Sequence, residues 1–105
     1  MEVKKLKNII NKRLNLSIYD EYAVSECWKE EVEILTSNID ETIVFFEKEC
    51  TDEEFCWLSE VFDDIISKTH SVDLIRVWEN RLSQMTDKTE KESVAIDIEF
   101  AKQNL

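Results

Sequence analysis

The chain has 105 residues, a formal net charge of −11, and neither glycine nor proline. Hairpin turns depend on glycine, asparagine and aspartate, so the missing glycine argues against a β-sheet. The large negative charge argues against DNA, RNA and anionic membranes as partners. Because 43% of the residues are hydrophobic, the chain can bury a core. We therefore predict a single all-α domain over residues 1–105.

The predicted helices follow one another with short polar connectors. They span residues 3–14, 18–36, 39–50, 52–68 and 72–85. Capping residues mark most of their starts, since a Ser, Thr or Asn is followed three residues later by an acid. These pairs are Ser17 with Asp20, Asn38 with Glu41 and Thr51 with Glu54, and Ser71 is the expected cap of the fifth helix. The third helix is apolar on more than one face, so we expect it at the centre of the fold.

The last element begins after the polar stretch "TDKTEKE", where Thr89 and Glu92 form another capping pair. The stretch "VAIDIEF", residues 94–100, alternates between apolar and polar positions as a strand does. Such a strand could pair only with a second copy of the chain. A helix would instead direct inward Val94, Ala95, Ile98, Ala101 and Leu105. We expect the helix, which gives a bundle of five or six antiparallel helices stacked as hairpins.

The outer side of the predicted helix 52–68 carries acids around a tryptophan. The residues that we predict to bind a partner there are Glu53, Trp57, Glu60, Asp63 and Asp64. On a continuous helix, all of them except Asp63 form one ridge. Tryptophan is enriched among binding hot spots. Trp57 is thus either an exposed anchor for a partner or the flank of a helix that packs on two sides, whereas Trp28 and Trp78 lie on apolar stripes and are expected in the core.

Charge is distributed unevenly along the chain. Residues 1–14 carry five basic side chains and one acid, a net +4, whereas residues 20–64 carry sixteen acids and two lysines, a net −14. One interpretation is that the acids keep the protein soluble. The other is that they form a docking face for a strongly basic partner, whose approach such a field accelerates.

The chemically reactive side chains form no recognisable catalytic or metal-binding pattern. Cys27, Cys50 and Cys56 include no C-x-x-C pair, and together with His70 they have no zinc-site spacing. Nucleotide-binding loops require glycine, and no H-E-x-x-H motif is present. We therefore expect no enzymatic activity, no cofactor and no metal. The unpaired cysteines, with no signal peptide or membrane span in the sequence, predict a cytoplasmic protein.

The stretch "ECTDEEFCWLSEVFDDI", residues 49–65, and the "WENRL" of residues 78–82 resemble immunity proteins of bacterial contact-dependent growth inhibition systems, the CdiI type. The resemblance implies a small cytosolic protein that binds the toxic C-terminal domain of an effector, often a basic nuclease and here in particular a ribonuclease. It also implies that carboxylates block the active-site cleft of the toxin, where phosphates would lie. An acidic helical adaptor or anti-repressor, which binds another basic protein, is the alternative.

Overall fold

The computed structural model describes all residues from 1 to 105, and every regular element in it is a helix. In chain order the elements are α1 (Val3–Leu14), α2 (Glu21–Thr36), α3 (Ile39–Val44), a π-helix (Phe45–Glu49), α4 (Asp52–Leu58), a 3₁₀ segment (Ser59–Val61), α5 (Phe62–Thr69), α6 (Val72–Ser83) and α7 (Lys88–Lys102). If α3 is counted with its π-helix, and α4 with the 3₁₀ segment and α5, the chain forms six helical segments. The predicted all-α bundle of five or six helices is confirmed.

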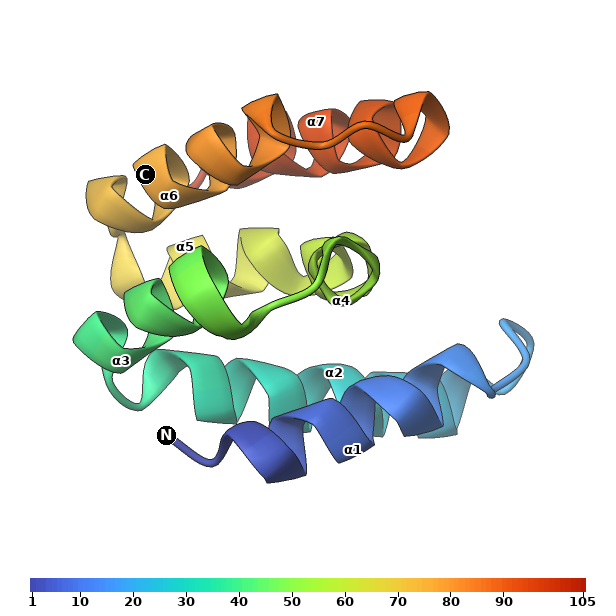
Figure 1. The fold of residues 1–105 in the computed structure, drawn as a ribbon. Coiled ribbons are helices and arrows are strands. Elements are labelled where there is room, and N and C mark those ends of the chain that lie inside the picture. The colour runs from blue at the N-terminus through green and yellow to red at the C-terminus, as the bar shows by residue number, and fades with distance from the viewer.

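The helices are stacked in three layers that follow the order of the chain (Figure 1). The hairpin of α1 and α2 forms one outer layer, and the hairpin of α6 and α7 forms the other. The middle layer contains α3, α4 and α5, and α5 packs on α2 on one side and on α7 on the other. The stacked arrangement of helical hairpins is thus the one expected from the short connectors.

Aromatic side chains fill the centre of the core. The ring of Phe46 makes edge-to-face contacts with Phe45, Phe55, Phe62 and Trp78, at centroid distances between 5.3 and 6.0 Å. The rings of Phe62 and Trp78 stack in parallel, 3.8 Å apart and 5° from coplanar. All five rings are fully buried, so Trp78 lies in the core as predicted. Aromatic contacts of this kind add about 0.5–1.5 kcal/mol per pair to the gain from burial.

Three of the predicted helix caps are present. Asn38, Thr51 and Ser71 each accept a hydrogen bond from the backbone N–H three residues later. Around Thr51 the capping box is complete, because the Glu54 carboxylate also accepts from the Thr51 N–H at 2.9 Å.

The predicted starts of two other helices were wrong. α2 begins at Glu21 with Asp20 as its cap, whereas we expected Ser17, and α7 is capped by Asp87, whereas we expected Thr89. Aspartate caps a helix about as well as serine does, so local sequence does not decide between neighbouring candidates.

The predicted continuous helix 52–68 is interrupted. The hydroxyl of Ser59 has two acceptors within hydrogen-bond distance, the Cys56 carbonyl at 2.6 Å and the Asp97 carboxylate at 2.7 Å. Its single proton is shared between them. A serine that bonds to a carbonyl in the preceding turn competes with the helical hydrogen bonds and favours a tighter 3₁₀ turn. α4 therefore ends at Leu58, and α5 leaves the 3₁₀ segment in a new direction (Figure 1).

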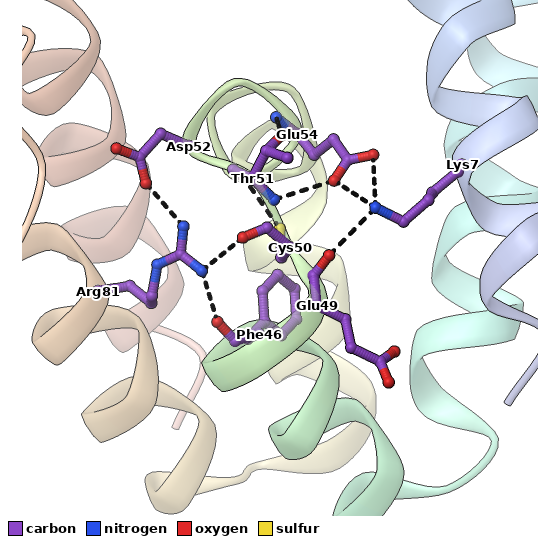
Figure 2. Close-up of polar contacts among 8 residues, drawn as sticks. All are labelled: Lys7, Phe46, Glu49, Cys50, Thr51, Asp52, Glu54 and Arg81. Carbon is purple, nitrogen blue, oxygen red and sulfur yellow. Dashed lines mark hydrogen bonds and ion pairs between the residues drawn. The ribbon is translucent and has the colours of Figure 1, made fainter.

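Two cations hold the junction between the π-helix and α4 from opposite sides (Figure 2). Lys7 of α1 donates to the Glu49 carbonyl at 3.1 Å and to the Glu54 carboxylate at 2.8 Å. Arg81 of α6 donates to the carbonyls of Phe46 and Cys50 and to the Asp52 carboxylate. The last carbonyls of a helix have no partner within it, and cations are favoured there by the helix dipole. The junction is thus tied to both outer layers.

The last element is a helix, as expected. Val94, Ile98 and Ala101 are buried and Ala95 is half-buried, but Leu105 is exposed, which corrects the prediction that it points inward. Leu105 follows the end of α7 at Lys102 and so does not continue the inward stripe. None of the helices combines the length and the apolar character that crossing a lipid bilayer would require.

Candidate functional site

The residues of the predicted ridge on helix 52–68 border several different hollows. Glu53 and Trp57 line a hollow of about 360 Å³ between α1 and α4, together with Lys7 and Asn11. Glu60 lies within the 3₁₀ segment and the two aspartates lie in α5, and all three border other hollows. The expectation of one continuous ridge was therefore wrong, because Ser59 breaks the helix that would have carried it. The role of these residues in partner binding stays a prediction.

Trp57 is half-buried and packs against the hydrophobic core. The guanidinium carbon of Arg13 lies 5.0 Å from the centroid of its ring, a distance typical of a cation–π contact. Both interpretations of Trp57 therefore apply in part: the ring flanks the α1–α4 contact, and one portion of it faces the hollow with Glu53.

Glu60 makes its closest contacts inside the protein. Its carboxylate accepts two hydrogen bonds from Arg13, at 3.0 and 2.6 Å, and one of 2.8 Å from the indole Nε1 of Trp28. The Arg13 side chain is 7% exposed and that of Glu60 is 24% exposed. The expectation of a freely solvated Glu60 was thus wrong. Trp28 is half-buried beside it, which also corrects its expected place in the core.

The first helix neutralises part of the acidic middle layer. Besides the Arg13–Glu60 pair, Lys7 pairs with Glu54. The N-terminal amine of Met1 pairs with Glu41. The opposite charges seen in the sequence therefore come together in part across the α1 interface.

Asp63 and Asp64 are both exposed but border different hollows. Asp64 lies with Lys29 and Lys68 around a hollow of about 390 Å³ between α2 and α5. Partial burial and the neighbouring Asp63 raise the pKa of Asp64, while Lys68 lowers it. Asp63 lines a different hollow, together with Glu60, Asp97 and Phe100, and no lysine or arginine lines that hollow. Of the two adjacent aspartates, only Asp63 therefore lines a hollow without a cation in its lining.

Two hollows meet at Glu60 on the side of the molecule formed by α2, α5 and α7. The first, about 470 Å³, lies between α2 and the end of α1, and the second, about 270 Å³, lies between the 3₁₀ segment and α7. We call the surface around both hollows the α2–α5–α7 face. Its lining residues are Arg13, Ile18, Glu21, Val24, Ser25 and Trp28 in the first hollow, Ser59, Asp63, Asp97 and Phe100 in the second, and Glu60 in both.

Apolar side chains stand exposed on the α2–α5–α7 face. Ile18 is 73% exposed at the edge of the first hollow, and Phe100 is 59% exposed at the edge of the second. Ile96, one helical turn before Phe100, is also exposed. Large side chains in this state commonly mark interaction sites when they lie close together and are rimmed by polar residues. The face thus has the composition of a protein-binding surface.

The charge of the α2–α5–α7 face is negative. Its hollows are lined by one arginine and four acids, a net −3, and Arg13 is already paired with Glu60. Burial raises the pKa of Asp97, and the negative charges of Glu60 and Asp63 act in the same direction, while the hydrogen bond from Ser59 lowers it. Neighbouring carboxylates repel one another, which raises their pKa values, and a cation that binds between them offsets this repulsion and stabilises their ionised forms.

The cysteines are poorly suited to nucleophilic chemistry. Burial raises the pKa of the Cys50 thiol to about 12. The pKa of Cys56 is also raised, mostly by burial and to a smaller extent by the negative charges of four nearby acids. Thiols with raised pKa values stay protonated and unreactive at neutral pH. His70 is exposed at the end of α5, in the left-handed region at φ 50°, and its Nδ1 lies 2.9 Å from the Asn104 carbonyl. No three acidic, histidine or cysteine side chains come together as a metal site.

Sequence reasoning missed Arg13, Ile18, Asp97 and Phe100 as parts of this surface. A signal for Phe100 was present, because on a helix Ile96 and Phe100 fall one turn apart and outside the stripe of Val94 and Ile98. No local pattern could pair Arg13 with Glu60, which lies 47 residues later.

The arrangement can recognise a cation-rich surface, with the acids attracting it and the exposed apolar side chains adding buried contact area. Comparison with family models, with curated proteins and with solved structures gives no match for this chain.

Proposed function

We propose that the chain is an immunity protein, which binds the basic toxin domain of a contact-dependent growth inhibition effector in the cytoplasm and neutralises it. The α2–α5–α7 face carries this proposal, because it combines unpaired acids with exposed apolar side chains around two hollows. The resemblance of residues 49–65 and 78–82 to immunity proteins names the class of partner. A ribonuclease is the partner we expect, because its cleft binds phosphates.

Free acids in the folded protein support a basic partner. Salt bridges engage only four of the sixteen acids between residues 20 and 64, namely Glu41, Asp52, Glu54 and Glu60. The remaining acids keep a negative field that attracts a basic protein before contact. At contact, Asp63 and Glu21 occupy positions where the cleft of a nuclease would otherwise hold phosphates. Phe100 and Ile18 then exclude water around these charged contacts, as the apolar residues of an interface do.

Co-expression with the toxin domain encoded beside the gene tests this proposal. We expect the wild-type chain to restore growth, to co-purify with the toxin domain, and to stop its cleavage of RNA in vitro. Growth arrest in cells where both proteins are soluble would contradict the proposal. A complex with a basic protein that has no toxic activity would support the adaptor alternative instead.

Two substitutions on the face locate the contact. Phe100→Ala should weaken binding about 30-fold or more, which corresponds to about 2 kcal/mol and is the usual threshold of a hot spot. Val72→Ala is its matched control, because Val72 is 50% exposed on α6, outside the face.

Asp63→Lys should also weaken binding strongly. Glu47→Lys changes the net charge by the same amount at an exposed position of the π-helix, so its effect should be much smaller. Equal effects of Asp63→Lys and Glu47→Lys would mean that charge acts only at long range and that the contact lies elsewhere.

A further inference from the structure

Glu31 of α2 is a carboxyl group with no hydrogen-bond partner inside the protein. The residue is 0% exposed, and neither of its side-chain oxygens has a donor within reach. Burying an ionised carboxylate without a partner is far more costly than burying the neutral acid. The side chain is therefore held as a neutral acid, and its position among charged groups calls for an explanation.

Two charges act on the Glu31 carboxyl, one from each of two neighbouring elements. Its pKa is raised to about 8, first by burial and then by the negative charge of Glu60 in the 3₁₀ segment, while the Arg13 guanidinium of α1 acts in the opposite direction. The titratable thiol of Cys27 lies one turn earlier on α2, and burial raises its pKa more than any neighbouring charge does.

Other charged groups also lie on helices packed against α2. Lys12 of α1 acts on the pKa of Cys27, and Asp63 of α5 lines a hollow together with Glu60. Asp64 and Lys68 of α5 lie with Lys29 at a separate hollow, and Asp40 and Glu41 of α3 lie with Met1 at another.

Arg13 is paired with Glu60 in the free protein through two of its three guanidinium nitrogens. The two side chains share two hydrogen bonds, through Nε and through Nη2, and Trp28 donates a third to the same carboxylate. Glu60 borders both hollows of the α2–α5–α7 face and is more exposed than Arg13, so its carboxylate is the part of this cluster that a partner reaches most easily. A change at Glu60 is transmitted through Arg13 toward Glu31, which is fully buried and which the partner cannot touch.

We propose that Glu31 is a second acid for Arg13, and that it releases its proton to solvent when a cationic side chain of the partner binds Glu60. The inference rests on the proposed function, since it assigns a lysine or arginine of the basic partner to the Glu60 position. The incoming cation offsets the negative charge of Glu60 that disfavours ionised Glu31. It also competes for the carboxylate oxygens, which frees Arg13 to pair with Glu31. Both effects favour the ionised form of Glu31.

The consequence is that partner binding is linked to pH. The pKa of Glu31 is about 8 in the free protein and lower in the complex, so each binding event releases up to one proton near neutral pH. Affinity then rises with pH between the two pKa values, by up to about tenfold per pH unit, and becomes constant above the higher one. A partner that binds the acids of the surface alone would show no such dependence in this range.

The link between Glu60 and Glu31 can be tested in the free protein. The carboxyl carbon of Glu31 is titrated by NMR in the wild type and in Glu60→Gln, which removes the charge of Glu60 and leaves Arg13 without an acid. We expect the pKa of Glu31 to fall by about 1–3 units, as for a carboxyl that gains an arginine. Asp63→Asn is the matched control, because Asp63 borders Glu60 without touching Arg13, and the pKa should stay near the wild-type value. An unchanged pKa in Glu60→Gln would overturn the inference.

Calorimetry of the complex tests proton release directly. Wild-type chain and toxin domain are titrated in two buffers that differ in their heat of protonation, at a pH just below 8. We expect the wild type to release a proton and Glu31→Gln, which mimics the neutral acid, to release none. A tight wild-type complex without proton release would overturn this inference and leave the proposed function standing. Absence of any complex would overturn both, whatever the free-protein titration gives.

Discussion

Arg81 of α6 donates a hydrogen bond of 2.7 Å to the backbone carbonyl of Cys50, 31 residues earlier, where the π-helix ends. The same nitrogen reaches the Phe46 carbonyl at 2.8 Å, and the side chain is only 11% exposed. A single guanidinium thus satisfies carbonyls that the π-helix leaves without partners and joins the middle layer to the α6–α7 layer (Figure 2).

Replacing this guanidinium should destabilise the fold. Arg81→Leu leaves two carbonyls and Asp52 without their donor, and we expect it to lower the free energy of unfolding by about 3 kcal/mol, the range of a broken buried charged network. Urea denaturation followed by circular dichroism measures the change. Arg76→Leu is the control, since Arg76 is exposed and reaches only Asp73, and it should cost less than about 0.5 kcal/mol. Similar losses in both variants would show that the Arg81 network contributes little.

Trp57 should affect stability more than binding. Its ring is half-buried between α1 and α4 and lies under the Arg13 guanidinium, so Trp57→Ala should lower the free energy of unfolding by about 2 kcal/mol, less than the 3–5 kcal/mol of a fully buried ring. Denaturant melts and toxin titration measure the two effects in the same protein. A Trp57→Ala variant of normal stability that no longer binds would move the interface to the hollow with Glu53.

Glu31 should make the protein less stable as pH rises. Its pKa is raised from 4.5 to about 8 on folding, so the folded protein holds a proton that the unfolded chain releases within this window. Its stabilising contribution is complete below pH 4.5 and is lost as pH rises toward 8, by at most about 1.4 kcal/mol per pH unit. Glu31→Gln cannot ionise and should lack this loss.

Urea melts from pH 5 to 9 measure the free energy of unfolding of the wild type and of Glu31→Gln. The difference between the two proteins cancels the pH dependence that other acids contribute, such as Glu54, whose pKa is lowered in the folded protein. Parallel stability curves for the two proteins would show that Glu31 is already ionised, or solvated, at neutral pH.

Association with the toxin domain should depend on salt. Since most acids of residues 20–64 remain unpaired, the association rate constant should fall at least about tenfold from low to high ionic strength, while dissociation changes less. Stopped-flow mixing at several salt concentrations measures both rate constants. An association rate that does not respond to salt would assign the acids to solubility alone.

The parts of the fold that depend on nearby residues could be predicted from the sequence. The absence of glycine, the apolar spacing and the capping box of Thr51 and Glu54 are local signals, and they predicted the all-α class and the order of the helical segments, although the starts of two helices were wrong. The break in the helix at Ser59 could not be predicted, because one of the two acceptors of the Ser59 hydroxyl is Asp97, 38 residues later.

The candidate site was only partly predictable for the same reason. Asp63 was predicted to bind a partner from its acidic position; it is exposed and lines one hollow of the α2–α5–α7 face, and its role stays a prediction. Glu60 was chosen as a free acid, but its charge is satisfied by Arg13, which no helical period connects to it. Phe100 was grouped with strand-like neighbours, and its exposure became clear only once α7 was seen to pack through Val94 and Ile98.

The α2–α5–α7 face takes residues from all three layers: Glu21 and Ile18 from the first, Glu60 and Asp63 from the middle, and Asp97 and Phe100 from the last. The face therefore exists only while all three layers are packed together. Partial unfolding that detaches the α6–α7 layer from α5 would remove Asp97 and Phe100 from it, so binding through this face depends on the integrity of the whole fold.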